Sequence, residues 1–114
     1  MLTPSEELAE MDRLIHEPAR LALTTALMAD ADADFVFLQT LTGLTKGNLS
    51  SHLHKLEQAG VVTLTKTGAG RAARTWVSLT SQGHEAVRGH WQRLEGLRNL
   101  AEGGLDARDP GPSG

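Results

Sequence analysis

The chain has 114 residues, which is enough for one compact domain with a single core and too few for two. Its apolar and charged fractions, 39% and 22%, are those of an ordinary soluble globular protein. The absence of cysteine excludes disulfides, zinc–thiolate sites and thiol nucleophiles. No apolar run approaches the roughly 18 residues of a membrane span, and the acidic first residues are unlike a signal peptide, so we expect a cytoplasmic protein.

The net charge of −3 is unevenly distributed along the chain. Between Gly43 and Leu79 there are five lysine and arginine residues and one acidic residue, Glu57, so this segment carries +4 and the rest carries −7. A basic segment on an otherwise acidic body is typical of a localised contact with nucleic acid.

Capping residues and apolar spacing predict three helices in the first part of the chain. Thr3 opens a capping box before the first helix, and Pro18 fits only the first turn of the second. A loop over residues 30–34 follows, and its last residue, Asp34, can cap a short helix that ends at Gly43. The expected helices cover residues 4–15, 18–29 and 35–42.

The second part of the chain contains two further helices and one hairpin. Thr45 caps a helix that Gly60 ends, and Thr80 caps a longer final helix. Two β-branched segments around a glycine-rich turn predict a β-hairpin between these helices. The expected ranges are 45–59 for the first helix, 61–65 and 75–79 for the strands, 67–70 for the turn and 81–102 for the last helix.

This order of elements predicts a mainly α protein with a small β-hairpin, in the α+β class. Two consecutive helices joined by a tight turn and followed by a hairpin are typical of a winged helix-turn-helix, here with extra N- and C-terminal helices. We expect one domain over residues 1–102 and a disordered Gly- and Pro-rich tail over residues 103–114.

The helix over residues 45–59 has the properties of a recognition helix. Leu49, Leu53 and Leu56 fall on one side and are expected to be buried. The opposite side is small and polar without a central acidic residue, so it can approach base edges and phosphates closely. The candidate DNA-binding residues in this helix are Thr45, Lys46, Asn48, Ser50, Ser51, His54 and Lys55.

The hairpin places three cations, Lys66, Arg71 and Arg74, around its glycine-rich tip. Solubility alone would also account for cations at an exposed turn. The functional interpretation is a wing over about residues 66–74 that contacts backbone phosphates beside the recognition helix, which would make the affinity strongly salt-dependent.

Two stretches of this sequence resemble the winged-helix regulators of the MarR and ArsR type. They are LTGLTKGNLSSHLHKLEQAGVV, from Leu41, and the segment from Gly70 to Gly83 with its LTSQG end. The resemblance covers about residues 18–87 and is closest to the minimal single-domain form. It implies DNA binding through the helix and wing residues above and dimerisation through the terminal helices. One departure is Ala72-Ala73 between the wing arginines, where many relatives carry an acidic and a basic residue.

The terminal helices are candidates for a homodimer interface, because a lone winged helix covers one half-site only. The last helix is longer than packing on so small a domain requires, and its apolar stripe is wider than one neighbour should cover. Intramolecular packing of the last helix on the first is the alternative. The candidate interface residues are Leu8, Met11, Ile15, Val87, Trp91, Leu94, Leu97 and Ala101.

The histidines and the remaining polar residues do not predict a metal site or an enzyme. The pairs His52/His54 and His84/His90 lack the spacing of ligands on one helical face, and His52 is expected to be a half-buried packing residue. No serine has an obvious base, no paired carboxylates recur, and no glycine loop joins a strand to a helix. We therefore expect no catalysis, no cofactor and no metal.

The leading hypothesis is a homodimeric regulator of transcription, expected to be a repressor, that binds specific double-stranded DNA sequences. The alternative is a winged helix used as a protein-interaction module in a larger assembly, which the acidic body favours and the basic hairpin disfavours. A small-molecule effector stays open: Phe35, Phe37, His90 and Trp91 could line a cleft, but core packing explains them equally well.

Overall fold

The computed structural model describes residues 1–29 and 32–104. Within them the helices are α1 (Pro4–His16), α2 (Pro18–Ala29), α3 (Phe35–Thr42), α4 (Lys46–Gln58) and α5 (Ser81–Asn99). The strands are β1 (Ala33–Asp34), β2 (Val62–Thr67) and β3 (Arg74–Leu79). There are also two short helical turns in the described residues, η1 (Gly70–Ala72) and η2 (Leu100–Gly104). Positions 30 and 31 of the expected loop and 105–114 of the expected tail lie outside the described residues.

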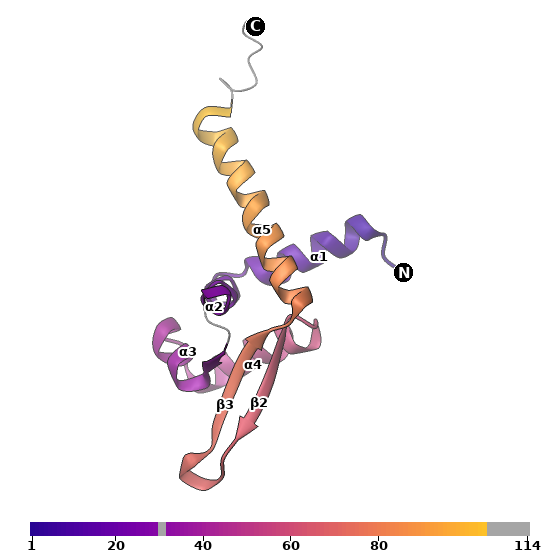
Figure 1. Ribbon diagram of the computed structural model, residues 1–114. Coiled ribbons are helices and arrows are strands. Elements are labelled where there is room, and N and C mark those ends of the chain that lie inside the picture. The colour runs from indigo at the N-terminus through magenta and orange to yellow at the C-terminus, as the bar shows by residue number, and fades with distance from the viewer. Residues whose placement is uncertain (30–31, 105–114) are drawn as a thin grey trace, which may run out of the picture.

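The elements form a small body with two projections (Figure 1). Helices α2, α3 and α4 pack with the sheet, and the β2–β3 hairpin extends from this body in one direction. Helix α5 extends in the opposite direction, and α1 crosses it near its beginning. The α+β winged-helix architecture expected from the sequence is therefore confirmed.

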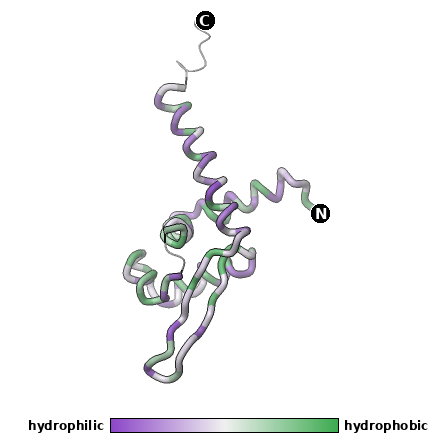
Figure 2. Tube along the Cα trace, viewed as in Figure 1, coloured by the Kyte–Doolittle hydropathy of each residue, from purple (hydrophilic) through white to green (hydrophobic). Residues whose placement is uncertain are grey.

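The core is built from leucine and valine side chains on the inner sides of α2, α3, α4 and the sheet. The three leucines expected on the inner face of α4 are fully buried, and burial of each such side chain contributes roughly 1.5–3 kcal/mol. Helix α3 is mostly hydrophobic along the trace (Figure 2). The core cluster comprises Leu23, Leu27, Ala33, Leu38, Leu49, Leu53, Leu56, Val61, Val62 and Val77.

Side-chain caps fix the starts of four helices where the sequence predicts them. Thr3 and Glu6 form the reciprocal capping box of α1. The three further caps each accept a hydrogen bond from a backbone N–H of the first turn: Asp34 in α3, Thr45 in α4 and Thr80 in α5.

The sheet has one strand more than the predicted hairpin. Ala33 and Asp34, expected to be loop, form β1 and pair antiparallel with β3, which gives the strand order β1-β3-β2. Alanine and aspartate have low strand propensity, so this pairing comes from tertiary contact: Ala33 is buried in the core opposite Val77.

The hairpin and the last helix differ from their predicted limits by one to three residues. Both strands are longer than expected, because the ladder continues from Val62 opposite Leu79 to Thr67 opposite Arg74. The turn between them contains a short 3₁₀ segment over Gly70–Ala72 instead of a plain glycine turn. Helix α5 ends at Asn99, and a π-helical turn follows it directly.

The LTSQG segment joins the hairpin to α5 through close backbone packing. The hydroxyl of Thr80 caps α5 by accepting from the Gly83 amide at 2.8 Å, and it also donates to the carbonyl of Gly60 at 2.6 Å. A Cβ on Gly83 would stand 2.1 Å from the carbonyl oxygen of Val61. Only glycine therefore allows α5 to begin so close to the end of α4.

Candidate nucleic-acid interface

The outer surface of α4 carries the side chains that the sequence predicts for DNA contact. The buried side of the helix is occupied by leucines, which leaves the small and polar residues in solvent. Every predicted site residue of this segment is exposed: Thr45, Lys46, Asn48, Ser50, Ser51, His54 and Lys55.

The N-terminus of α4 has the electrostatics of an anion-binding end. Thr45 Oγ1 accepts from the Asn48 amide at 3.1 Å. The amides of Lys46 and Gly47 belong to the first turn and have no acceptor within the helix. The first turn contains no acidic residue. The helix dipole and the Lys46 ammonium group therefore act together on any phosphate at this end.

The flank of α4 facing α2 is fixed by a polar contact that sequence reasoning missed. His52 is half-buried, as expected, with 18% of its side chain exposed, and its Nδ1 lies 3.1 Å from Nη1 of Arg20. Nε of Arg20 also donates to the Leu14 carbonyl at 2.6 Å. The Arg20 amide hydrogen-bonds the Glu17 carboxylate and lowers its pKa. These contacts join residues up to 32 positions apart, so no local pattern in the sequence indicates them.

The wing residues Lys66, Arg71 and Arg74 are all exposed. Arg71 belongs to the 3₁₀ turn at the hairpin tip. Arg74 begins β3, and its Nη1 donates to Oδ2 of Asp34 at 2.7 Å. Sequence reasoning assigned Asp34 only the cap of α3, so this link between the wing and the helix-turn-helix was missed.

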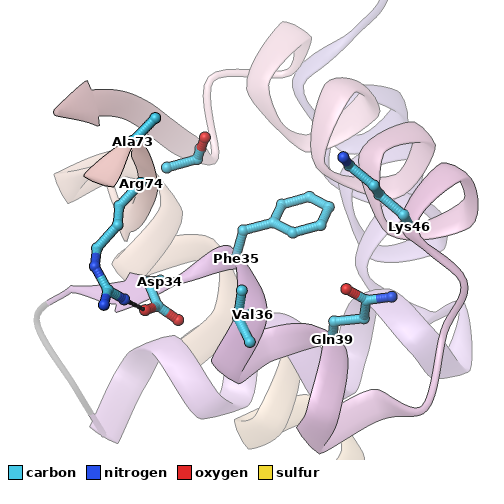
Figure 3. A pocket seen from close by; sticks show the side chains of 8 residues that line it. Asp34, Phe35, Val36, Gln39, Lys46, Ala73 and Arg74 are labelled. Carbon is cyan, nitrogen blue, oxygen red and sulfur yellow. Dashed lines mark hydrogen bonds and ion pairs between the residues drawn. The ribbon is translucent and has the colours of Figure 1, made fainter. Parts of the chain in front are cut away.

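A hollow of about 250 Å³ lies between the start of β3, α3 and the start of α4 (Figure 3). Phe35 stands in its centre, with Lys46 on one side and Arg74 on the other. The structure thus brings a cation of the recognition helix and a cation of the wing to one surface. The lining residues are Asp34, Phe35, Val36, Gln39, Lys46, Ala73, Arg74 and Thr75.

Polar side chains connect α1 to α5. The guanidinium group of Arg93 donates two hydrogen bonds to Asp12. Nδ1 of His16 lies 3.0 Å from Nε2 of the buried His90, and Nδ1 of His90 lies 3.1 Å from Asp12 Oδ1 without the alignment of a hydrogen bond. No local sequence pattern indicates this cluster, because its α1 members lie more than 70 residues from its α5 members. Among the described residues no three His, Asp or Glu side chains are placed to hold a metal ion.

The candidate dimer residues fall into three groups. Ile15 and Val87 have no exposed surface in one protomer, so they pack its interior. The sequence could not distinguish these two residues from the rest of the apolar stripe of the last helix and its neighbour. Only the structure shows that α5 packs on α1 at this point. Met11 and Leu94 are partly buried, and the exposed members are Leu8, Trp91, Leu97 and Ala101.

The four residues suggested for an effector cleft lie in different places. Phe35 lines the hollow beside the wing, and Phe37 is exposed on α3. His90 faces α1 in a groove with Leu94 and Leu97. Trp91 is exposed on the surface of α5, and its indole N–H donates to the hydroxyl of Thr25. They do not form one cleft in this protomer.

Within residues 1–29 and 32–104 no helix is both long and apolar enough to cross a membrane. The fold, with an exposed polar helix beside a basic wing, defines a winged-helix transcriptional regulator. The family model described as winged helix DNA-binding domain matches residues 19–97, and the chain belongs to this family.

Individual relatives agree with this assignment. A transcriptional regulator homologue from Pyrococcus horikoshii OT3 is 32% identical, with a TM-score of 0.76 over 85% of this chain and 98% of that one. An uncharacterized protein of Methanocaldococcus jannaschii is 27% identical over 77% of this chain and 97% of its own length. A MarR mutant from E. coli, solved in complex with operator DNA, shares the fold at 19% identity and a TM-score of 0.56, over 75% of this chain and 66% of that one.

Proposed function

We propose that this chain binds specific double-stranded DNA sequences as a homodimer and represses transcription. Helix α4 enters the major groove, and the β2–β3 wing follows the adjacent backbone. The observation that carries the proposal is the shared hollow of Lys46 and Arg74, which places the polar helix and the basic wing on one surface. The MarR mutant bound to operator DNA has the same fold, which supports this use of the surface.

The dimer is supported by the unpacked end of α5. From Glu95 to Gly103 every residue is exposed in one protomer, although Leu97 and Leu100 are apolar and remain 63% and 50% exposed. Isolated helical segments of this length are marginal in water. Pairing with the same segment of a second copy would cover these leucines and set two α4 helices one turn of DNA apart.

Binding alone is sufficient for the proposed role. A dimer of this size that occupies promoter DNA blocks access to it without a further interaction surface. The proposal therefore assigns the chain no catalytic activity and no cofactor.

Selection of bound sequences from a random duplex pool tests the proposal. We expect an enriched inverted repeat whose half-sites are centred about 10 base pairs apart. Ser51→Ala and His54→Ala should change the selected bases within each half-site, while Lys55→Ala, as a control for phosphate contacts, should weaken binding to all sequences alike. Failure of the purified protein to bind any duplex at low salt would contradict the proposal.

A protein-interaction module is the second candidate, and one observation favours it. Helix α3 exposes three apolar side chains, Val36, Phe37 and Leu41, which are 65%, 47% and 51% exposed. Such a module would show no duplex binding in the same selection, and it would retain a partner on co-purification after mutation of the basic wing.

A further inference from the structure

One carboxylate connects the first helix of the helix-turn-helix to the wing. Oδ1 of Asp34 accepts from the backbone N–H of Phe37 at 2.7 Å and caps α3. Oδ2 of the same group accepts from Nη1 of Arg74 at 2.7 Å (Figure 3). Asp34 is therefore held by the fold on one oxygen and neutralises a wing cation with the other.

The two partners of this ion pair differ in their freedom to move. The Asp34 side chain is 17% exposed and anchored by its cap, whereas the Arg74 side chain is 58% exposed. A guanidinium group binds carboxylate and phosphate with the same fork of donors. Arg74 can thus exchange one acidic partner for another by rotating its side chain, while Asp34 stays in place.

The pair lies inside the surface that we assign to DNA. Asp34 and Arg74 line the hollow that Lys46 closes on the opposite side. A backbone phosphate that approaches this hollow meets two cations and one fixed anion. The anion opposes the phosphate directly, and it also holds the guanidinium group that the phosphate would bind.

We propose that Asp34 is a built-in counter-anion that competes with a DNA backbone phosphate for Arg74 and so lowers the affinity of the chain for duplex DNA. This inference rests on the proposed DNA-binding function. In the free protein Arg74 is paired with Asp34, and in the complex the phosphate takes its place. The carboxylate thereby sets how strongly the wing contributes to binding.

Asp34→Asn separates the two roles of the residue, because asparagine is also a good N-cap and keeps an oxygen for the Phe37 amide. The measurement is fluorescence anisotropy of a labelled duplex, selected from the random pool, at several salt concentrations. Since an exposed ion pair is worth little, we expect binding about two- to tenfold tighter than wild type. The salt slope should become steeper by up to about one unit per protomer. Unchanged or weaker binding would overturn the proposal.

Asp32→Asn is the matched control, because it removes the same charge two residues earlier. Asp32 Oδ1 accepts from the Ser78 hydroxyl at 2.7 Å and lies outside the Asp34–Arg74 pair. We expect a much smaller change in affinity than for Asp34→Asn. Equal tightening by both variants would mean that any loss of negative charge acts in the same way, and the specific competition would be refuted.

A double-mutant cycle identifies the partner of the carboxylate. In an Arg74→Ala background, Asp34→Asn should give less than half of its effect on affinity, because the guanidinium group for which phosphate competes is gone. A full effect in that background would overturn the proposal. Thermal unfolding is measured in parallel, and Asp34→Ser, which also retains a capping oxygen, replaces Asp34→Asn in the cycle if the latter unfolds early.

Two failures are distinguishable in these experiments. If wild type binds duplex DNA and Asp34→Asn binds no more tightly, this inference alone is wrong. If wild type, Asp34→Asn and Asp32→Asn all fail to bind any duplex at low salt, the proposed function is wrong and this inference falls with it.

Discussion

The guanidinium group of Arg93 holds the carboxylate of Asp12 with two hydrogen bonds of 2.7 and 2.6 Å. This pair joins the second half of α5 to the last turns of α1. Because both side chains are partly open to solvent, we expect Asp12→Asn to lower the free energy of unfolding by about 1 kcal/mol at neutral pH. Glu10→Gln, an exposed change on the same helix, is the control in urea unfolding and should have no measurable effect.

The same pair predicts how stability depends on pH. Partial burial acts to raise the pKa of Asp12, but the hydrogen bonds and charge of Arg93 and the nearby imidazole of His90 together lower it by more, so the net shift is downward. A carboxyl group whose pKa is lower in the folded state stabilises the fold above its unfolded pKa, about 3.9. That contribution is lost as the pH falls through the lowered folded value. Between pH 5 and pH 2.5, wild type should therefore lose more stability than Asp12→Asn, and parallel losses would contradict the assignment.

Gly83→Ala is expected to destabilise the protein, because the added methyl group would stand 2.1 Å from the Val61 carbonyl oxygen. Backbone cannot yield as a flexible side chain does, so the loss should be about 1–3 kcal/mol. Gly96→Ala on the same helix meets nothing within 4 Å and should stabilise by roughly 0.5–1 kcal/mol. Thermal unfolding distinguishes the two, and a shift of the melting temperature in the same direction for both would disprove the close-packing argument.

Local patterns were sufficient for the helices and for the side of α4 that is exposed. Thr45 predicts the start of α4, and the three buried leucines define its outer face by geometry alone. The LTSQG segment was recognisable as a motif, but its physical reason, Gly83 against the Val61 carbonyl, required coordinates. Signals of this kind lie within about four residues of each other along the chain, which is the range over which helical periodicity and capping act.

Contacts between distant segments could not be predicted. Ala33 enters the sheet because Val77 lies beside it, and Arg74 finds Asp34 across 40 residues. His16 and His90 meet across 74 residues. In each case the residue type is compatible with several environments, and only the packing of α1, α5 and the sheet selects one. For this reason the sequence did not show that Ile15 and Val87 are fully buried within one protomer.

The proposed homodimer predicts a specific effect of charge on the distal part of α5. Leu97 is 63% exposed in one protomer, so Leu97→Glu should leave the monomer fold intact. In the dimer the glutamate would be buried beside its symmetry mate, and the dimer dissociation constant should rise about tenfold or more. Sedimentation velocity over a range of micromolar concentrations measures this change.

Leu41→Glu is the control for that experiment, because Leu41 is 51% exposed on α3, away from α5. We expect it to leave the dimer dissociation constant unchanged. A wild-type protein that is monomeric at all concentrations would exclude the homodimer. Dissociation by Leu41→Glu but not by Leu97→Glu would place the interface on α3 instead.

The wing predicts a loss of affinity that does not depend on sequence. Arg71 lies in the 3₁₀ turn at the hairpin tip and is exposed. If its guanidinium group contacts a phosphate, Arg71→Ala should weaken binding to selected and random duplexes by the same factor. The slope of log affinity against log salt should fall by about one unit per protomer.

Arg98→Ala is the matched control, because it removes the same charge from α5 at the end of the molecule opposite the wing (Figure 1). Arg98 is paired with Glu95, so its loss leaves both the net field near the wing and the salt slope unchanged. Equal slopes for Arg71→Ala and wild type would show that the wing tip stays clear of the backbone, and phosphate contacts would then be confined to α4 and Arg74. A change of sequence preference in Arg71→Ala would instead mean that the wing reads bases in the minor groove.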